Sequence, residues 1–309
     1  MSARAKHLWI TQKMLKKTIM TLHKIRHNYD TNKCYYYVKC KKEVFMEQTE
    51  NVKNRPENEI TQLRNYKIIK ANDIIQKSRF NLQLQEQKII LYLISKIKPE
   101  DIELKEHIFQ IKDFCKVCGL NDDSGKNYTN IRQTLKDLRD KSIWVTLENG
   151  RERTLSWIDY VEMDKNNGSV TIKISDMMKP YLLQLKERYT QYELLYTLAM
   201  RSQYSIRIYE LLKSYEYQNK KIFEIDELKK ILFAEKYKLF GDFKRKVLDI
   251  SMREINELSD ITVIYKIIKE SRKFAKIEFI IKLKKDLNEK MTTWVKIDEA
   301  ISHKKRIKL

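Results

Sequence analysis

The sequence predicts an α+β protein in which two copies of one unit, each a set of helices followed by a β-hairpin, are arranged in tandem. Three observations predict this class. The order of helical and strand-like segments repeats after residue 66, their apolar residues follow helical or alternating spacing, and five glycines and three prolines leave little sequence for long irregular loops. A chain of 309 residues is long enough for two such units, each with its own core.

The first copy begins with a strongly apolar helix and ends with two hairpin signals that separate alternating strands. In chain order its segments are the helix 82–97, the strand 108–111, a helical stretch, the amphipathic run 126–141, the strand 143–147, the turn Glu148-Asn149-Gly150, the strand around Trp157, the turn Asn166-Asn167-Gly168 and the strand 170–174.

The second copy repeats this order. Its segments are the apolar helix 206–217, the strand 222–225, a helical stretch, the amphipathic run 242–258, the strand from Ile261 to Ile267, a turn over 269–273 and a returning strand 274–283. Helix, strand, helix, helix and β-hairpin are the parts of a winged helix, a helix-turn-helix with a hairpin wing. The predicted fold is therefore two tandem winged-helix domains related as an internal repeat.

Four regions follow from this repeat. Residues 1–65 form a basic extension and a polar linker, 66–185 the N-terminal winged helix, 186–285 a linker helix and the C-terminal winged helix, and 286–309 a Lys-rich tail. The linker helix is Tyr189–Leu198, whose apolar residues have helical spacing. Three roles are open to this helix: it joins the two units, it forms part of a dimer interface, or it packs inside the protein. Internal packing is the favoured alternative.

The first 45 residues carry eleven Lys or Arg against Asp30 and Glu43, and Leu8–Ile25 is spaced as a basic amphipathic helix. Because the composition changes at Met46, we expect translation to start there, or this stretch to be a flexible basic arm. The intact mass of the natively expressed protein tests the first alternative, since a species beginning at Met1 contradicts it.

The chain carries a formal net charge of +21, spread along its length, with a pI near 9.5. This favours a polyanion as partner, although codon bias in an A/T-rich genome also accumulates lysine. No apolar run approaches the ~20 residues that span a bilayer, and no secretory signal is present, so we expect no membrane contact and a cytoplasmic location.

The second helix of a helix-turn-helix enters the major groove, so one face is apolar and the opposite face polar and cationic. In the first copy, Ile131, Leu135 and Leu138 form the apolar stripe. The predicted DNA-facing residues on or beside the opposite face are Lys126, Thr129, Asn130, Arg132, Gln133 and Lys136.

In the second copy, Phe243, Val247, Ile250 and Ser251 define the buried side, and Lys244, Arg245 and Lys246 cluster near the start of the helix. Cations here oppose the helix macrodipole, a cost that bound phosphate or guanine reverses. Arg245 points farthest from the stripe and can donate two hydrogen bonds to guanine, so it is the candidate for base readout.

The second hairpin tip, 269–273, carries Lys269, Arg272 and Lys273 where a wing touches the DNA backbone or minor groove. Solubilising turn residues are the alternative explanation.

No catalytic, cofactor or metal site is predicted. Cys115 and Cys118 have the spacing of half a zinc site, but no second pair follows, so buried thiols are expected. The segment Gly119–Lys126 departs from a P-loop in glycine spacing and in Asn127, which replaces the Ser or Thr that binds Mg²⁺. The five histidines include no His-x-His pair of the kind that a nicking enzyme needs.

Several short sequence segments within the repeat resemble those of the RepB-family initiators of iteron-containing plasmids. The similarity runs from about Tyr66 to Lys285 and rests on Asn81–Ile90, Tyr204–Leu212 and the run Asp242-Phe-Lys-Arg-Lys-Val-Leu248 leading to Glu254-Ile-Asn256. It implies two winged helices on directly repeated iterons, with most base contacts from the C-terminal unit, and with backbone contacts and dimerisation from the N-terminal unit. Lys244, Arg245 and Lys246 then lie at the DNA, and Arg272 and Lys273 in the second wing.

The resemblance further implies that monomers initiate at iterons in double-stranded DNA, that dimers repress their own promoter, and that the host initiator, helicase and primase are recruited. It implies no enzymatic activity. Two alternatives stay open: a transcriptional repressor on the same fold, and a nicking enzyme of rolling-circle replication, which the missing histidine pair disfavours.

Overall fold

The structure, a computed structural model, describes residues 66–98, 100–111, 125–164, 168–271 and 273–306, all within one compact unit, Glu59–Leu309. The predicted helix Leu8–Ile25, the Met46 start and the four cysteines lie outside these residues, as do Arg272 and most of the glycine-containing segment Gly119–Lys126.

The first copy of the repeat is preceded by β1 (Lys67–Ala71), α4 (Asn72–Gln76) and β2 (Ser78–Arg79). Its own elements are α5 (Leu84–Ile94), β3 (Glu106–Gln110), α7 (Gly125–Asp140), β4 (Ser142–Thr146), β5 (Glu152–Ser156), β6 (Ile158–Asp164) and β7 (Ser169–Ile174). They form two antiparallel sheets, β2-β4-β5 and β3-β7-β6. Both predicted hairpin glycines have left-handed backbone, with φ +76° at Gly150 and +68° at Gly168.

The second copy follows the short elements η1 (Asp176–Met178) and α8 (Lys179–Leu182) and the segment between the copies. It consists of α10 (Gln203–Lys213), η2 (Glu216–Gln218), β9 (Lys220–Glu224), α11 (Ile225–Ile231), α12 (Phe240–Phe243), the π-helical turn η3 (Lys244–Leu248), α13 (Asp249–Leu258), β10 (Ile261–Glu270) and β11 (Lys273–Leu283). Its strands form one antiparallel sheet, β10-β11-β9.

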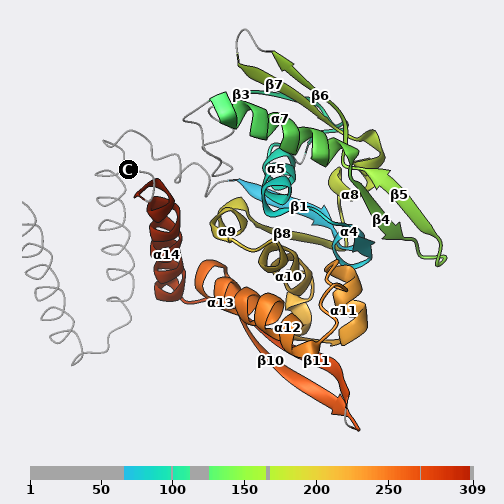
Figure 1. Cartoon of the computed structure of the whole chain (residues 1–309), viewed down its shortest axis with the longest axis vertical. Helices are drawn as coiled ribbons and strands as arrows, with labels where there is room; N and C mark the ends of the chain where they lie inside the picture. The colour runs from blue at the N-terminus through green and yellow to red at the C-terminus, as the bar shows by residue number, and fades with distance from the viewer. Residues whose placement is uncertain (1–65, 99, 112–124, 165–167, 272, 307–309) are drawn as a thin grey trace, which may run out of the picture. The chain divides into compact units, whose positions relative to one another are not determined.

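The predicted tandem winged-helix fold is confirmed by this order of elements (Figure 1). The copies differ in how their strands pair. In the second, the wing strand β11 pairs with β9, whereas in the first, β3 pairs with β7 and the β4–β5 hairpin pairs with β2 instead.

The prediction of a single helix over Tyr189–Leu198 is wrong in its first half. Tyr189–Glu193 is strand β8, antiparallel to β1, and only Leu194–Ala199 is helical, as α9. Thr190 and Tyr192 are buried while their neighbours Tyr189 and Gln191 are exposed, which is the period of a strand. All of α9 is buried, so the favoured alternative of internal packing is confirmed.

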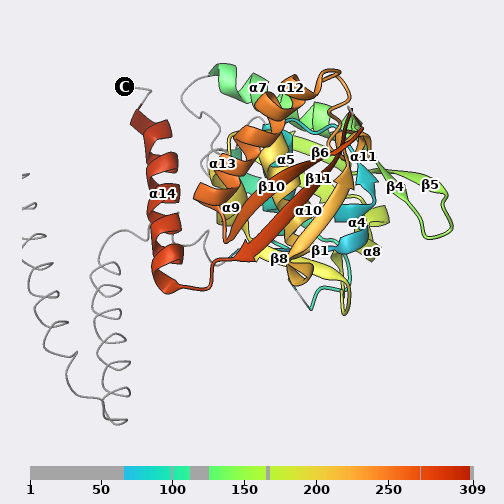
Figure 2. The same cartoon turned by 90° about the horizontal axis from the view of Figure 1, so that it is seen from below.

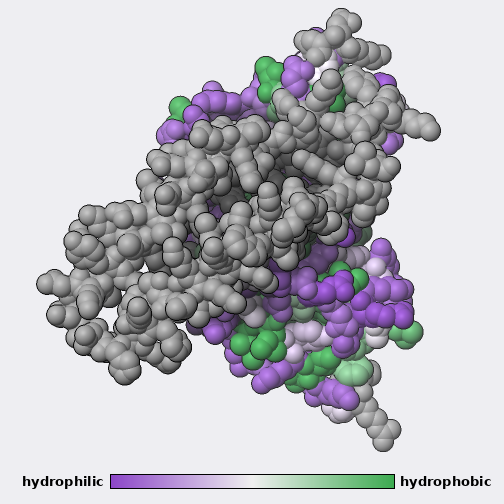
Figure 3. All heavy atoms as spheres, turned by 90° about the vertical axis from the view of Figure 1, so that its left-hand side faces the viewer, coloured by the Kyte–Doolittle hydropathy of each residue, from purple (hydrophilic) through white to green (hydrophobic). Residues whose placement is uncertain are grey.

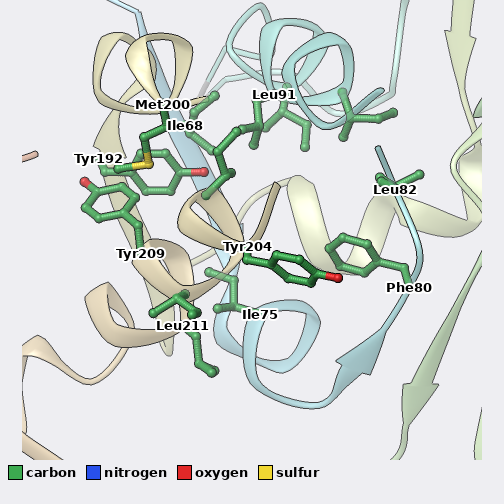
Figure 4. Close-up of a cluster of buried hydrophobic side chains, with 14 of the residues drawn as sticks. Ile68, Ile75, Phe80, Leu82, Leu91, Tyr192, Met200, Tyr204, Tyr209 and Leu211 are labelled. Carbon is green, nitrogen blue, oxygen red and sulfur yellow. The ribbon is translucent and has the colours of Figure 1, made fainter. Parts of the chain in front are cut away.

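The two copies share one hydrophobic core, in which side chains from the first copy, α9 and α10 interdigitate (Figure 4). Ile68, Leu93 and Tyr209 are fully buried within it. Lys70 of β1 forms an ion pair with Glu210 of α10, which also accepts a hydrogen bond from the Tyr192 hydroxyl. Because both charged side chains are at most 5% exposed, this pair is essentially dry.

The predicted Lys-rich tail contains α14 (Leu287–Arg306), which packs against α9 and α13. The buried Lys284 fixes its start, because its Nζ donates to the carbonyls of Asn256 and Ser259, each at 2.7 Å, and to Thr293 Oγ1 of α14 at 3.1 Å. No helix within the described ranges is both long enough and apolar enough to cross a lipid bilayer.

Candidate nucleic-acid interface

The N-terminal recognition helix, α7, has the two faces that its sequence predicts. Ile131, Leu135 and Leu138 are buried. The predicted residues Thr129, Asn130, Arg132, Gln133 and Lys136 are all exposed, while the side chain of Lys126 lies outside the described part of the chain. Gln133 Nε2 donates to Asp137 at 2.6 Å. The face combines amide, hydroxyl and cationic groups, which suit base edges and phosphate.

The C-terminal recognition segment, Phe240–Leu258, is not the uniform α-helix that was predicted. It consists of α12, the π-helical turn η3 and α13. A π turn accommodates one more residue than an α turn, so the buried stripe shifts: Val247 and Leu248 are both fully buried, and Ile250 is only half-buried. Phe243 and Ser251 are buried as expected.

The π turn contains the three predicted cations, and each contacts an aspartate. Lys244 Nζ lies 2.8 Å from both Asp249 oxygens. Asp242 Oδ1 lies 3.0 Å from the Arg245 guanidinium and 3.5 Å from Lys246 Nζ. The cost of cations early in the helix is thus offset by carboxylates, and Arg245, at 75% exposure, is held by an interaction that solvent weakens.

The wing is fastened to the recognition segment by side chains at both ends of the β10–β11 hairpin. Phe240 stacks on Phe274 near the tip, with ring centroids 4.5 Å apart. At the base, the Asn256 side chain exchanges two hydrogen bonds with the backbone of Val263. In between, Tyr265 donates to Asp249 at 2.7 Å.

These contacts also act on the Lys244–Asp249 pair. The hydrogen bond to Asp249 raises the pKa of Lys244. Burial raises the pKa of Asp249, and the hydrogen bonds from Lys244 and Tyr265 lower it. The hydrogen bonds together have the larger effect, so the pKa of Asp249 is below its usual value. Both groups are therefore charged near neutral pH.

At the wing tip, Ser271 has left-handed backbone with φ +56°. Lys269 is exposed, with its Nζ 5.0 Å from the Phe274 ring centroid. Arg272 lies outside the described residues, and Lys273 is placed only as the first residue of β11.

The two recognition elements lie on the same side of the described unit. In Figure 2, α7 and α12 both lie at the upper edge, and in Figure 1 they are separated along the vertical axis. In Figure 3 the coloured lower part of the surface, at the height of α13 and the β10–β11 hairpin, is mostly hydrophilic with separate apolar patches.

Between the copies the structure contains a hollow of about 660 Å³, here called the seam hollow, which sequence reasoning missed. It is lined from both copies by Arg79, Asn81, Gln83, Leu84, Arg201, Ser202, Gln203, Tyr204, Phe233, Glu235, Lys236 and Lys246. Arg79 pairs across the seam with Glu235 at 2.5 Å and lies over the Phe233 ring at 4.9 Å. No local pattern in the sequence connects these positions, which only the fold brings together.

No cluster of three or more His, Cys, Asp or Glu side chains suited to a metal ion occurs among the residues that the structure describes.

Two family models match the chain. "Initiator Replication protein, WH1" matches residues 67–213, and "Initiator Rep protein, WH2" matches residues 224–281. The chain is also similar to the PI protein of Escherichia coli, with 30% identity over 147 residues that cover 41% of this chain and 48% of that protein. The chain thus matches about half the length of this curated relative.

A solved structure of similar fold is the crystal structure of the Pi initiator protein in complex with iteron DNA. It has a TM-score of 0.59 and 22% sequence identity, and the match covers 72% of this chain and 99% of that one. This likeness supports the assignment of two winged helices.

Proposed function

The chain belongs to the family of initiator Rep proteins, and from that membership we propose that it starts plasmid replication by binding iteron DNA with both winged helices. The observation that carries the proposal is the pair of recognition elements on one side of the molecule, each with a buried apolar stripe and an exposed polar or cationic face. The relative of known structure that shares this fold was crystallised with iteron DNA.

Within this function, α7 and the C-terminal recognition segment enter two major grooves of one duplex. Arg245 leaves Asp242 and donates two hydrogen bonds to a guanine, while Lys244 and Lys246 bind phosphate. Arg272 and Lys273 in the wing bind the backbone or the minor groove. On α7, Lys126, Arg132 and Lys136 bind phosphate, and the polar residues Thr129, Asn130 and Gln133 lie within reach of bases.

The proposed cellular output is origin remodelling without catalysis by this chain. Host initiator, helicase and primase are recruited by contact, and a dimer of the same chain represses its own promoter. The resemblance to RepB-family initiators supports these proposed steps, and they require no site beyond the DNA-binding surfaces and surfaces for protein contacts.

Footprinting of the purified protein on the DNA around its own gene, with random DNA in excess and salt varied, tests the function. We expect protection of several evenly spaced direct repeats. Protection of a single palindrome would instead indicate a dedicated repressor, and a strand-specific nick would indicate an enzyme.

Substituting Arg245 tests its role. Arg245→Ala is expected to weaken binding to the specific site by about 1 to 3 kcal/mol and to relax discrimination at one base pair. Equal weakening on specific and random DNA would remove Arg245 from base readout.

A further inference from the structure

The seam hollow brings together cations that no single element carries. Arg79 ends β2, Arg201 precedes α10, Lys236 follows α11, and Lys246 belongs to η3. Glu235 is the one acidic residue among the lining residues. Positive charges repel one another, so placing four of them around one opening costs free energy. An anion bound in the opening offsets this repulsion.

Two of these cations lack a carboxylate partner. Arg79 is held by Glu235 at 2.5 Å, and Lys246 shares Asp242 at 3.5 Å. Arg201 and Lys236 are exposed and form no ion pair with any carboxylate in the described part of the chain. Neither therefore has to break an ion pair to bind a ligand, and the contact of Lys236 is with an aromatic ring, its Nζ lying 5.3 Å from the Tyr237 ring centroid.

The hollow lies between the two recognition elements. Lys246 on its wall is the neighbour of Arg245 in the C-terminal recognition segment. On the opposite wall, Leu84 begins α5, whose Glu86 forms an ion pair at 2.6 Å with Lys141, the residue that follows α7. The walls of the hollow are therefore connected to both recognition elements.

We propose that the seam hollow binds a backbone phosphate of the DNA at the point where the strand passes from one winged helix to the other. The proposal rests on the proposed function and names a contact that belongs to neither winged helix alone. Its volume of about 660 Å³ is many times the ~15 Å³ that one water molecule requires, so the hollow has room for a group larger than water, such as a phosphate. Arg79 exchanges Glu235 for phosphate oxygens, to which a guanidinium donates two parallel hydrogen bonds.

Lys236→Gln, with Lys238→Gln as its matched control, tests the site. Both lysines are exposed and lie in the loop between α11 and α12, but only Lys236 lines the hollow. On a random duplex, Lys236→Gln is expected to lower the salt dependence of binding by about 0.9 in log–log slope, an affinity loss of about eightfold at roughly 0.1 M salt, while Lys238→Gln changes it much less.

The position of the contact is tested on the footprinted repeat with single phosphates replaced by neutral methylphosphonates. We expect one position, between the two protected grooves, to weaken binding of the unsubstituted protein and of Lys238→Gln more than it weakens binding of Lys236→Gln, which has already lost one of the cations at that phosphate. The proposal is overturned if both variants bind random duplex alike, or if every methylphosphonate affects both equally. Absence of protected repeats would instead contradict the proposed function, and the random-duplex comparison still tests the hollow.

Discussion

Replacing Asp242 with asparagine tests whether an internal carboxylate limits non-specific DNA binding. Asp242 Oδ1 lies 3.0 Å from Arg245 and 3.5 Å from Lys246, so a single carboxylate restrains two cations. The run from Asp242 to Asp249 carries three positive and two negative charges, hence a net charge of +1. Asp242→Asn raises it to +2 and leaves both cations available to phosphate.

The size of the effect follows from counterion release. One additional phosphate neutralised on duplex DNA steepens the log–log salt dependence by about 0.9, which corresponds to about eightfold tighter binding at roughly 0.1 M salt. We expect this gain on random DNA. At the specific site, where we propose that Arg245 contacts a base, the gain should be smaller, and the ratio of specific to random affinity should fall several-fold. Stability changes by at most about 1 kcal/mol, because the pair is exposed.

Titrations of labelled repeat and random duplexes at several salt concentrations measure both affinities. Glu257→Gln is the matched control, since it removes the same charge from α13 at an exposed position that forms no described ion pair with the three cations. If Asp242→Asn binds random DNA no more tightly than Glu257→Gln does, Asp242 does not restrain the cations and the reasoning is refuted.

Three further predictions concern stability. Lys70→Met leaves the Glu210 carboxylate buried without its cation and should lower the free energy of unfolding in urea by about 3 to 5 kcal/mol. The double variant with Glu210→Met should regain part of this loss, because it removes the buried carboxylate but also the acceptor of the Tyr192 hydroxyl; strictly additive losses would argue against a coupled pair. Burial raises the pKa of Tyr192 and Tyr209 well above 10, so both are neutral in the folded protein. Their contribution to the free energy of unfolding is complete below pH 10 and should be lost progressively as the pH rises beyond 10. Unchanged urea midpoints at pH 8 and pH 11 would contradict this. Gly150→Ala should lower the melting temperature at a cost of about 1 kcal/mol from its φ of +76° alone, because no atom lies within 4 Å of the added methyl; an unaltered melting curve would show that the turn relaxes freely.

The amphipathic segments were the most predictable part of the fold. Leu135 and Leu138 are buried and Gln133 and Lys136 exposed on α7, because a helix that packs against a core on one side reveals that side through its period. The internal repeat was equally predictable, because each winged helix needs the same segments in the same order. The structure of Tyr189–Leu198 was not predictable in this way. It is a strand followed directly by a buried helix, and its apolar residues also fit the period of one continuous helix.

The sequence predicts that Lys244, Arg245 and Lys246 cluster on one turn, as the structure shows, but it does not assign their aspartate partners. Asp242 and Arg245 are three residues apart, a spacing at which helical side chains meet, so that signal was available. The π turn, which moves Leu248 inward and leaves Ile250 half-buried, had no such signal. The seam hollow was beyond local reasoning altogether, because Arg79 and Lys246 meet only after both copies have folded.

The buried contacts between the two winged helices fix the distance between the two recognition elements. Lys70 of β1 pairs with Glu210 of α10, and Lys88 Nζ of α5 donates to the Leu198 carbonyl of α9 at 2.7 Å. These contacts hold the N-terminal winged helix to α9 and to the second copy. Separating them exposes buried charge, so the distance between the two recognition elements is costly to alter. DNA advances by about 3.4 Å and turns by about 34° with every base pair, given a helical turn of 34–36 Å in 10–10.5 base pairs. Inserting one base pair between the two halves of a repeat should therefore disrupt binding as severely as changing a base that is read, even though every contacted base is unchanged.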